Sequence, residues 1–245
     1  MYNVYEDLIS LYASHHVPVG NRYKAVIKQA LGKNLAYATS AMQGLATTIF
    51  SSPSMVAYNL LQNSVDEAKG AARVNLIADR YASGSLKDKM KQHVRDELKH
   101  SAQFLSLLKV TGVSDYTFEG ESNGKAEAEK TLDFDDELQK FICRVHSIEI
   151  RSWTILRLYM QIIQDSPNPQ LAAAIPVLEK IMADEINHVL YTGQTISDWI
   201  ESDPERDVAS ELLECFAFTN KETWHDMAQM SNFLAENASE MLIAA

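Results

Sequence analysis

The sequence predicts an all-α fold: a four-helix bundle with one long crossover, plus further helices at its N- and C-terminal ends. Glycine and proline are scarce, nine and six in 245 residues, and they separate long stretches with helical patterning. One long polar stretch, 114–135, lies between two predicted helical hairpins at 54–112 and 134–201. Two helical hairpins joined by a long connection are typical of a four-helix bundle.

The individual elements follow from the positions of the residues that interrupt helices. The breaks fall at Pro18-Val19-Gly20, Ser52-Pro53, Ser83-Gly84, 111–134, Ser166-Pro167-Asn168-Pro169 and Asp203-Pro204. We expect helices near 5–15, 22–51, 54–82, 86–112, 134–165, 169–201 and 205–237. The chain is expected to form a single domain, 1–245, with the core of the bundle at about 54–201.

Net charge and cysteine content restrict the partners and the setting. The formal net charge is −11, and repulsion therefore disfavours nucleic acid and anionic membranes as partners. The two cysteines, Cys143 and Cys215, form no Cys-x-x-Cys motif, which argues against a disulfide framework or a zinc knuckle. The first residues, MYNVYEDLIS, lack the basic and apolar regions of a signal peptide, and we expect a cytoplasmic protein.

A stretch without any charged residue, 34–65, has to be distinguished from a membrane span. Polar side chains recur through it and Pro53 interrupts it, whereas a spanning helix needs about 20 predominantly apolar residues. We therefore expect helical segments that are hidden by internal packing or by a second subunit, and no contact with a membrane. Such a stretch favours a homodimer.

Two copies of the pattern Asp-Glu-x-x-His carry the functional signal. The first, in RDELKH, contains Asp96, Glu97 and His100, and the second, in MADEINHVL, contains Asp184 and the pair Glu185 and His188. Residues three apart share one face of a helix, so each copy can direct a carboxylate and an imidazole to the same point.

A dinuclear metal site in a bundle needs one further glutamate from each of the other two helices. Glu67 and Glu149 occupy the first helices of the two hairpins. Counted from the predicted turns at 1.5 Å per residue, Glu67 and Glu97 differ in height by about 6 Å, roughly one turn. By the same count Glu149 and Glu185 are predicted to lie at nearly the same height along the bundle.

A metal site explains the presence of these six residues better than ordinary structural roles do. Glu149 lies in the largely apolar RVHSIEIRSWTILRLYM, where an unpaired carboxylate is costly. Four carboxylates in one layer repel one another unless cations neutralise them, and two divalent ions do so. The predicted metal ligands are Glu67, Glu97, His100, Glu149, Glu185 and His188. A third Glu-x-x-His, Glu222 and His225, has no glutamate of its own and is expected to lie outside the site.

The order Glu…DExxH…Glu…DExxH resembles the ferritin-like di-iron carboxylate superfamily over roughly 54–201. The two DExxH copies are most similar to the bacterial multicomponent monooxygenases and to the p-aminobenzoate N-oxygenase type. The resemblance implies a ferritin-like bundle that holds two iron ions, although manganese or a mixed iron and manganese pair also suits the ligands. It implies that Asp96 and Asp184 accept hydrogen bonds from the ligand histidines.

The resemblance also implies the activity. We expect an O₂-activating non-haem di-iron oxygenase or oxidase that acts on a small organic metabolite, with O₂ as co-substrate and an external electron donor. Two alternatives stay open: an iron-handling protein with ferroxidase activity, and a manganese catalase or peroxidase. A storage protein would form a large hollow oligomer, whereas an enzyme of this kind should be a monomer or a dimer.

Several neighbours of the predicted ligands are candidates for supporting roles. Ser64 and Ala71 lie near Glu67 and are small enough to leave a cavity, while Trp153 and Tyr191 would line or support the pocket. His93 precedes Glu97 by four residues and His146 precedes Glu149 by three, offsets that share a helix face. Each is a candidate for an additional ligand or for a hydrogen-bonding partner of a ligand. His93 lies two turns from His100, about 10 Å along the axis, which counts against ligation.

Overall fold

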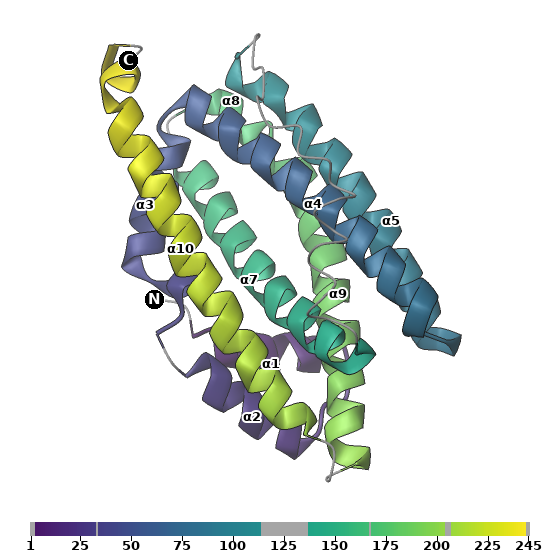
Figure 1. Cartoon of the computed structure of the whole chain (residues 1–245). Coiled ribbons are helices and arrows are strands. Elements are labelled where there is room, and N and C mark those ends of the chain that lie inside the picture. Colours follow the sequence, from purple (N-terminus) through teal and green to yellow (C-terminus); the bar gives the residue numbers. More distant parts are fainter. Residues whose placement is uncertain (1–2, 33, 114–136, 167, 204–206, 244–245) are drawn as a thin grey trace.

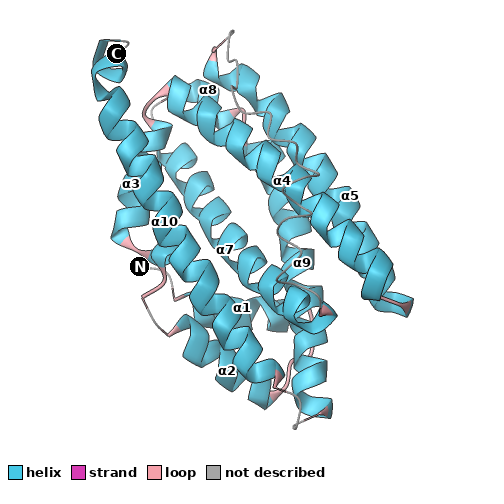
Figure 2. Ribbon diagram, viewed as in Figure 1, coloured by secondary structure: helices cyan, strands magenta, loops and turns pink. Residues whose placement is uncertain are grey.

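The structure is a computed structural model in which the described residues are 3–32, 34–113, 137–166, 168–203 and 207–243. Every regular element in these ranges is a helix (Figure 2). This confirms the predicted all-α class. The polar segment 114–135, predicted to form the long crossover, lies outside the described residues.

Four long helices form the centre of the fold as two pairs (Figure 1). The first pair is α4 (Pro53–Tyr81) and α5 (Gly84–Leu107), and the second is α7 (Leu138–Asp165) and α9 (Ile175–Ser202). Helix α5 also packs on α9, and α4 contacts α7. The two predicted hairpins are therefore present, and their four helices surround a common interior.

The turn of the first pair depends on a glycine. After α4 ends, Ala82 and Ser83 have extended backbone conformations, and Gly84 begins α5 with φ of +55°. Glycine adopts this left-handed conformation without the steric cost that other residues meet, so the chain reverses direction sharply. At its other end α5 continues into a short 3₁₀ helix, η2 (Leu108–Thr111), which completes the element predicted at 86–112.

The helix predicted at 169–201 is wrong in one respect, because the chain forms two helices there. A short helix, α8 (Pro169–Ala172), precedes α9. Asn168 caps α8 by accepting a hydrogen bond from the backbone N–H of Gln170 at 3.0 Å. Pro176 lies in the first turn of α9, where its missing N–H needs no partner.

The single helix predicted at 22–51 is also wrong. The chain forms α2 (Asn21–Leu31), a 3₁₀ turn η1 (Ala36–Ala38) and α3 (Ser40–Phe50). Contacts with the C-terminal helix hold the break open: the side chain of Asn220 accepts from the backbone N–H of Ala36 at 2.7 Å and donates to the carbonyl of Asn34 at 3.3 Å. A tertiary contact therefore overrides the local helical pattern.

The remaining helices cover one side of the second pair. Helix α2 packs on α9 and on α10 (Val208–Ile243), α1 (Val4–Ser14) packs on α2, and α10 runs along α7 (Figure 1). These correspond to the terminal helices predicted near 5–15 and 205–237; residues 204–206 lie outside the described residues. Gly193 permits the close docking of α1 and α2, since a Cβ there would meet the hydroxyl groups of Tyr12 and Tyr23.

The long helices carry apolar clusters at two levels, with a polar layer between them. One cluster includes Val56 of α4, Phe104 of α5 and Ile181 of α9. The other includes Ile77 of α4 and Met90 of α5, together with apolar residues of α9 from 189 onward. On these three helices the intervening positions hold buried carboxylates and imidazoles. Apolar packing above and below therefore encloses the polar layer and excludes water from its ends.

Much of the uncharged stretch 34–65 is accounted for by packing within the chain. Its large apolar residues, such as Tyr37, Ile49 and Met55, are buried, and its exposed positions are mainly small or polar. Among the described helices none combines the length and the apolar character required to cross a membrane.

Candidate metal centre

Seven buried or half-buried side chains converge in the polar layer, from all four long helices. Helix α5 contributes three, at spacings of four and three residues that place them on one face. Helix α9 contributes two, while α4 and α7 contribute one each. The seven are Glu67, His93, Glu97, His100, Glu149, Glu185 and His188. The six predicted ligands are all among them, and His93 is the addition.

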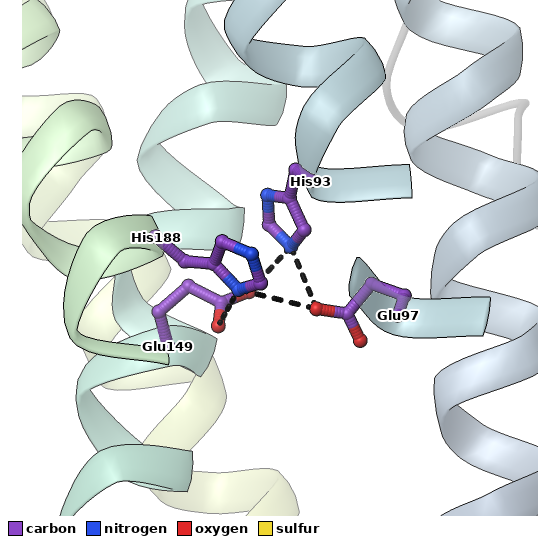
Figure 3. A group of neighbouring side chains, drawn as sticks. All are labelled: His93, Glu97, Glu149 and His188. Carbon is purple, nitrogen blue, oxygen red and sulfur yellow. Dashed lines mark ion pairs between the residues drawn. The ribbon is translucent and has the colours of Figure 1, made fainter. Parts of the chain in front are cut away.

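The first group of four consists of His93, Glu97, Glu149 and His188 (Figure 3). The Nε2 atom of His93 lies 3.0 Å from Oε1 of Glu97 and 3.4 Å from Oε1 of Glu149. The Nδ1 atom of His188 lies 3.2 Å from Oε1 of Glu97 and 3.7 Å from Oε2 of Glu149. One ligand atom from each residue falls within 4.8 Å of all the others, so the group could hold a single metal ion.

The second group of four consists of Glu67, Glu97, His100 and Glu185. The Nδ1 atom of His100 lies 3.3 Å from Oε1 of Glu185 and 3.9 Å from Oε1 of Glu97. The ligand atoms again fall within 4.8 Å of one another. Glu97 belongs to both groups, and a shared carboxylate of this kind can bridge two neighbouring ions.

His93 reaches the cluster although it lies two turns from His100. The two histidines serve different groups, and Glu97 lies between them on α5 and belongs to both. A separation of about 10 Å along the helix axis is therefore no obstacle, because the two imidazoles need not meet at one ion. Distance would count against His93 as a ligand only if His93 and His100 had to bind the same ion.

His146 is buried but lies away from the cluster. Its Nε2 is 2.6 Å from the hydroxyl of Tyr23, and its Nδ1 is 2.8 Å from Oγ1 of Thr192. Burial lowers the pKa of His146 to about 3, so the ring is neutral. Thr192 donates to the carbonyl of His188 at 2.6 Å, and Nδ1–H of His146 therefore donates to Thr192 while Nε2 accepts from Tyr23.

The aspartates of the two DExxH copies face the histidines of the opposite copy. Oδ2 of Asp184 lies 3.3 Å from Nε2 of His100, and Oδ2 of Asp96 lies 3.6 Å from Nε2 of His188. Lys99 also donates to Asp184 at 2.6 Å. In each histidine the Nδ1 atom faces the cluster and the Nε2 atom faces an aspartate. Such an arrangement fixes the ring orientation and leaves Nδ1 available to a metal ion.

The electrostatics of the cluster show how protons balance its charge. Burial raises the pKa of Glu67 and of Glu185, and neighbouring carboxylates raise both further, to about 8 at Glu185. Burial lowers the pKa of the three histidines, but the facing carboxylates, and Tyr191 at His93, raise it above the ordinary value. Protons on imidazoles and glutamates thus occupy a site that metal ions could take over.

Glu97 and Glu149 behave in the opposite way. Burial raises the pKa of each carboxyl group, but the facing imidazoles of His93 and His188 lower it, and a hydrogen bond from Glu67 adds to the effect at Glu97. The pKa of both groups falls below its usual value, so both are ionised. Two ionised carboxylates at the centre of a buried layer are suited to divalent cations.

The donor atoms fit metal ions better than they fit one another. Several are fully buried and make no aligned hydrogen bond within the part of the chain that the structure describes: Oε1 of Glu97, Nδ1 of His100, Oε2 of Glu185 and Nδ1 of His188. Buried polar atoms normally have a partner. Their short distances to facing groups without hydrogen-bond alignment are consistent with a shared cation at the centre.

A cavity of about 610 Å³ lies against the cluster. One wall is a face of α4 and another is a face of α7, and His93, Glu97, Glu149 and Glu185 reach it from the interior. Most small-molecule sites have volumes of about 300–1,000 Å³, so the cavity is large enough for an organic ligand of ordinary size.

Four residues predicted to line or support the pocket lie elsewhere. Ser64 bonds Ser101 of α5 across 3.0 Å, which directs it away from α7. Ala71 and Trp153 are buried in helix packing. Three neighbours on the same segment of α4, Asn63, Gly70 and Val74, do line the cavity.

Tyr191 has a different role from the one predicted. Its hydroxyl lies 2.8 Å from Nδ1 of His93, so it fixes the orientation of that ring, as Asp184 does for His100. Glu222 and His225 are exposed on α10, and the side chain of Gln229 lies 2.9 Å from Nε2 of His225. They stand outside the cluster, as expected.

The sequence reasoning missed three arginines that line the cavity: Arg73, Arg144 and Arg151. Helix periodicity offered no signal for them. Arg73 follows Glu67 by six residues, and Arg144 and Arg151 lie five residues before and two after Glu149. At 3.6 residues per turn these offsets fall about 120–160° around the helix from the glutamates, and only the packing of the helices brings the arginines to the same cavity.

Comparison with known proteins yields no match to this chain among family models, curated proteins or solved structures. The arguments about function therefore depend on the side chains and their geometry.

Proposed function

We propose that the protein is a ferritin-like non-haem dinuclear metalloenzyme that activates O₂ to oxidise a small organic molecule. The observation that carries the proposal is the pair of buried four-residue groups that share Glu97. Two helices of the bundle contribute a lone glutamate each, and two contribute Glu-x-x-His, which is the pattern of dinuclear carboxylate sites in four-helix bundles.

The donor set supports iron, with manganese as the second choice. Four carboxylates and three imidazoles, without a thiolate, suit these metals better than they suit copper(I) or structural zinc. When bound, a pair of such ions supplies the electrons and coordination positions needed to reduce O₂. The protein's part is to hold the ligands, exclude stray water and admit the substrate.

Individual residues have definable roles in this proposal. His93, Glu149 and His188 would hold one ion, while Glu67, His100 and Glu185 would hold the other, and Glu97 would join the two. Asp96, Asp184 and Tyr191 orient the three imidazoles through the ring nitrogen that faces away from the ions. Glu67 is the least buried of the four glutamates and borders the cavity, so it can change position with the least disruption.

The cavity favours an organic substrate over the two alternatives. An iron-handling protein with ferroxidase activity, or a manganese catalase or peroxidase, needs space only for ions, O₂ or peroxide. A volume of about 610 Å³ in direct contact with Glu97 and Glu149 exceeds that requirement.

The proposal is tested by metal content, assembly size and O₂ consumption measured on one preparation. We expect two iron ions per chain, a monomer or homodimer in solution, and consumption of O₂ by the reduced protein. Glu97→Ala should lose both ions, whereas the control His225→Ala should keep both. A hollow assembly of about 24 subunits that accumulates iron would contradict the proposal in favour of storage. Rapid peroxide disproportionation by the manganese form alone would favour a catalase.

A further inference from the structure

Four basic side chains border the cavity beside the cluster. Lys69 and Arg73 of α4 and Arg144 and Arg151 of α7 line it, whereas Asp66 is the one acidic lining residue outside the cluster. The whole chain is acidic, with 22 lysines and arginines against 33 aspartates and glutamates. Four cations of an acidic chain therefore border one cavity, next to the four glutamates of the cluster that reach it from the interior.

Two of these cations interact with each other. Burial, and to a smaller extent repulsion from Arg144, together lower the pKa of Arg73 to about 10. Both side chains are partly shielded from solvent. Arg151 is directed partly elsewhere, with its Nη1 3.8 Å from Asp226.

Aromatic rings hold the two guanidinium groups in position. The guanidinium carbon of Arg73 lies 5.9 Å from the ring centre of Phe141, and that of Arg144 lies 4.4 Å from the ring centre of Phe218. Cation–π contacts of this length restrict the long side chains. A planar guanidinium that is already oriented is well suited to paired hydrogen bonds with a carboxylate or a phosphate.

The rest of the lining is suited to an apolar body. Val74 of α4 and Val145 and Ile148 of α7 line the cavity, and Glu149 follows directly on α7. A molecule whose charged end meets the arginines can therefore place its apolar part beside the cluster. An apolar surface with a few convergent polar groups is typical of small-ligand sites.

We propose that the cavity binds a small organic anion, whose carboxylate or phosphate group pairs with Arg73 and Arg144 while its apolar body lies along Val74, Val145 and Ile148. The anionic group anchors the molecule and presents an uncharged carbon or nitrogen atom to the cluster. This inference names the substrate class of the proposed oxidoreductase and to that extent rests on the proposed function, but the binding itself does not require the metal ions.

The test compares three ring compounds of similar size by calorimetric titration: benzoate, phenyl phosphate and the neutral benzamide. Each is titrated into the metal-free protein and into the protein loaded with Mn(II), and the metal content of every sample is measured. Arg73→Gln and Arg144→Gln remove one guanidinium each. Arg95→Gln is the matched control, because Arg95 is exposed on α5, where it donates to the side chain of Gln92, and does not line the cavity. Circular dichroism checks that each variant is folded.

Benzoate or phenyl phosphate should bind at least about tenfold more tightly than benzamide, the factor expected for one charge-assisted hydrogen bond. Arg73→Gln and Arg144→Gln should each remove about tenfold in affinity, while Arg95→Gln should bind as the wild type does. The stronger of the two anions identifies the charged group. Equal binding of benzamide would overturn the inference. So would wild-type affinity in both folded cavity variants, because the anion would then sit on the metal ions or elsewhere.

Metal content separates this inference from the proposed function. Arginine-dependent binding of the anion to protein that takes up no metal would support the anion site and contradict the dinuclear enzyme. Two ions per chain without arginine-dependent binding would leave the dinuclear centre in place and overturn the anion site.

Discussion

His93 of α5 and His188 of α9 stack their imidazole rings, with centroids 3.7 Å apart and planes inclined by 15°. Each ring directs one nitrogen toward Glu97 and Glu149. Two parallel imidazoles that face the same pair of carboxylates could form one side of a metal site. The stack also explains how a histidine from outside the DExxH copies enters the cluster.

Replacement of His93 should weaken the binding of one metal ion and leave the binding of the other unchanged. In His93→Ala we expect the affinity for one of the two ions to fall about tenfold or more, by analogy with the cost of perturbing a metal site. Glu67, Glu97, His100 and Glu185 remain to hold the other ion. Competitive titration with a metal-binding dye measures both affinities. His225→Ala serves as the control, and two unchanged affinities in His93→Ala would exclude His93 as a ligand.

The metal-free protein should lose stability as the pH rises from about 6.5 to about 8. The folded pKa of Glu185 is raised from 4.5 to about 8, and a raised pKa gives stability that is lost as the pH rises. The pKa of His93 and of His188 is also raised, so the stability that these two histidines contribute is likewise lost as the pH rises above 6.5. The lowered pKa of Glu97 stabilises the folded protein, and this stabilisation is fully present above pH 4.5. It therefore does not change between pH 6.5 and 8.

Thermal unfolding at pH 6.5 and 8, with chelator and with anaerobic Mn(II), checks this behaviour. The melting temperature should fall with pH in chelator. It should stay level or rise with Mn(II), because metal binding displaces the protons and strengthens as the pH rises. A metal-free protein that is equally stable at both pH values would show that the cluster does not retain its protons.

Gly193→Ala should destabilise the fold by about 1–3 kcal/mol, the usual cost of overpacking. The new Cβ would meet the hydroxyl of Tyr12, and it would approach the hydroxyl of Tyr23 to 2.8 Å. Gly44→Ala is the matched control, since a Cβ there meets nothing within 4 Å and should stabilise α3 by about 1 kcal/mol. Urea unfolding measures both. In a Tyr12→Phe background Gly193→Ala should cost less, and equal costs in both backgrounds would place the strain elsewhere.

The elements that the sequence predicts well are those with strong local signals. The four long helices follow from helical periodicity and from breaks such as Gly84. Six of the seven cluster residues follow from the spacing of the two DExxH copies and of the two lone glutamates. The helix predicted at 22–51 failed because its break depends on Asn220, a residue nearly two hundred positions away. No local pattern contains that contact.

The details of the cluster needed three-dimensional information for a similar reason. Spacing placed both His93 and His146 on a ligand face, and only the positions of α9 and α2 separate them. His93 meets His188 and Glu149, whereas Tyr23 and Thr192 take both nitrogens of His146. The cavity arginines lie on other sides of α4 and α7 than the face predicted from Glu67 and Glu149, and which cations border the cavity depends on how α4 and α7 pack.

The central claim is that two metal ions lie in the polar layer on either side of Glu97. Its most direct test is a crystal structure of the iron-loaded protein with anomalous scattering measured at the iron edge. The account predicts two anomalous peaks per chain, about 3.5–4 Å apart as in other two-metal sites. One should be bound by His93, Glu149 and His188, and the other by Glu67, His100 and Glu185, with Glu97 between them. A single peak, or peaks outside these two groups, would contradict the account.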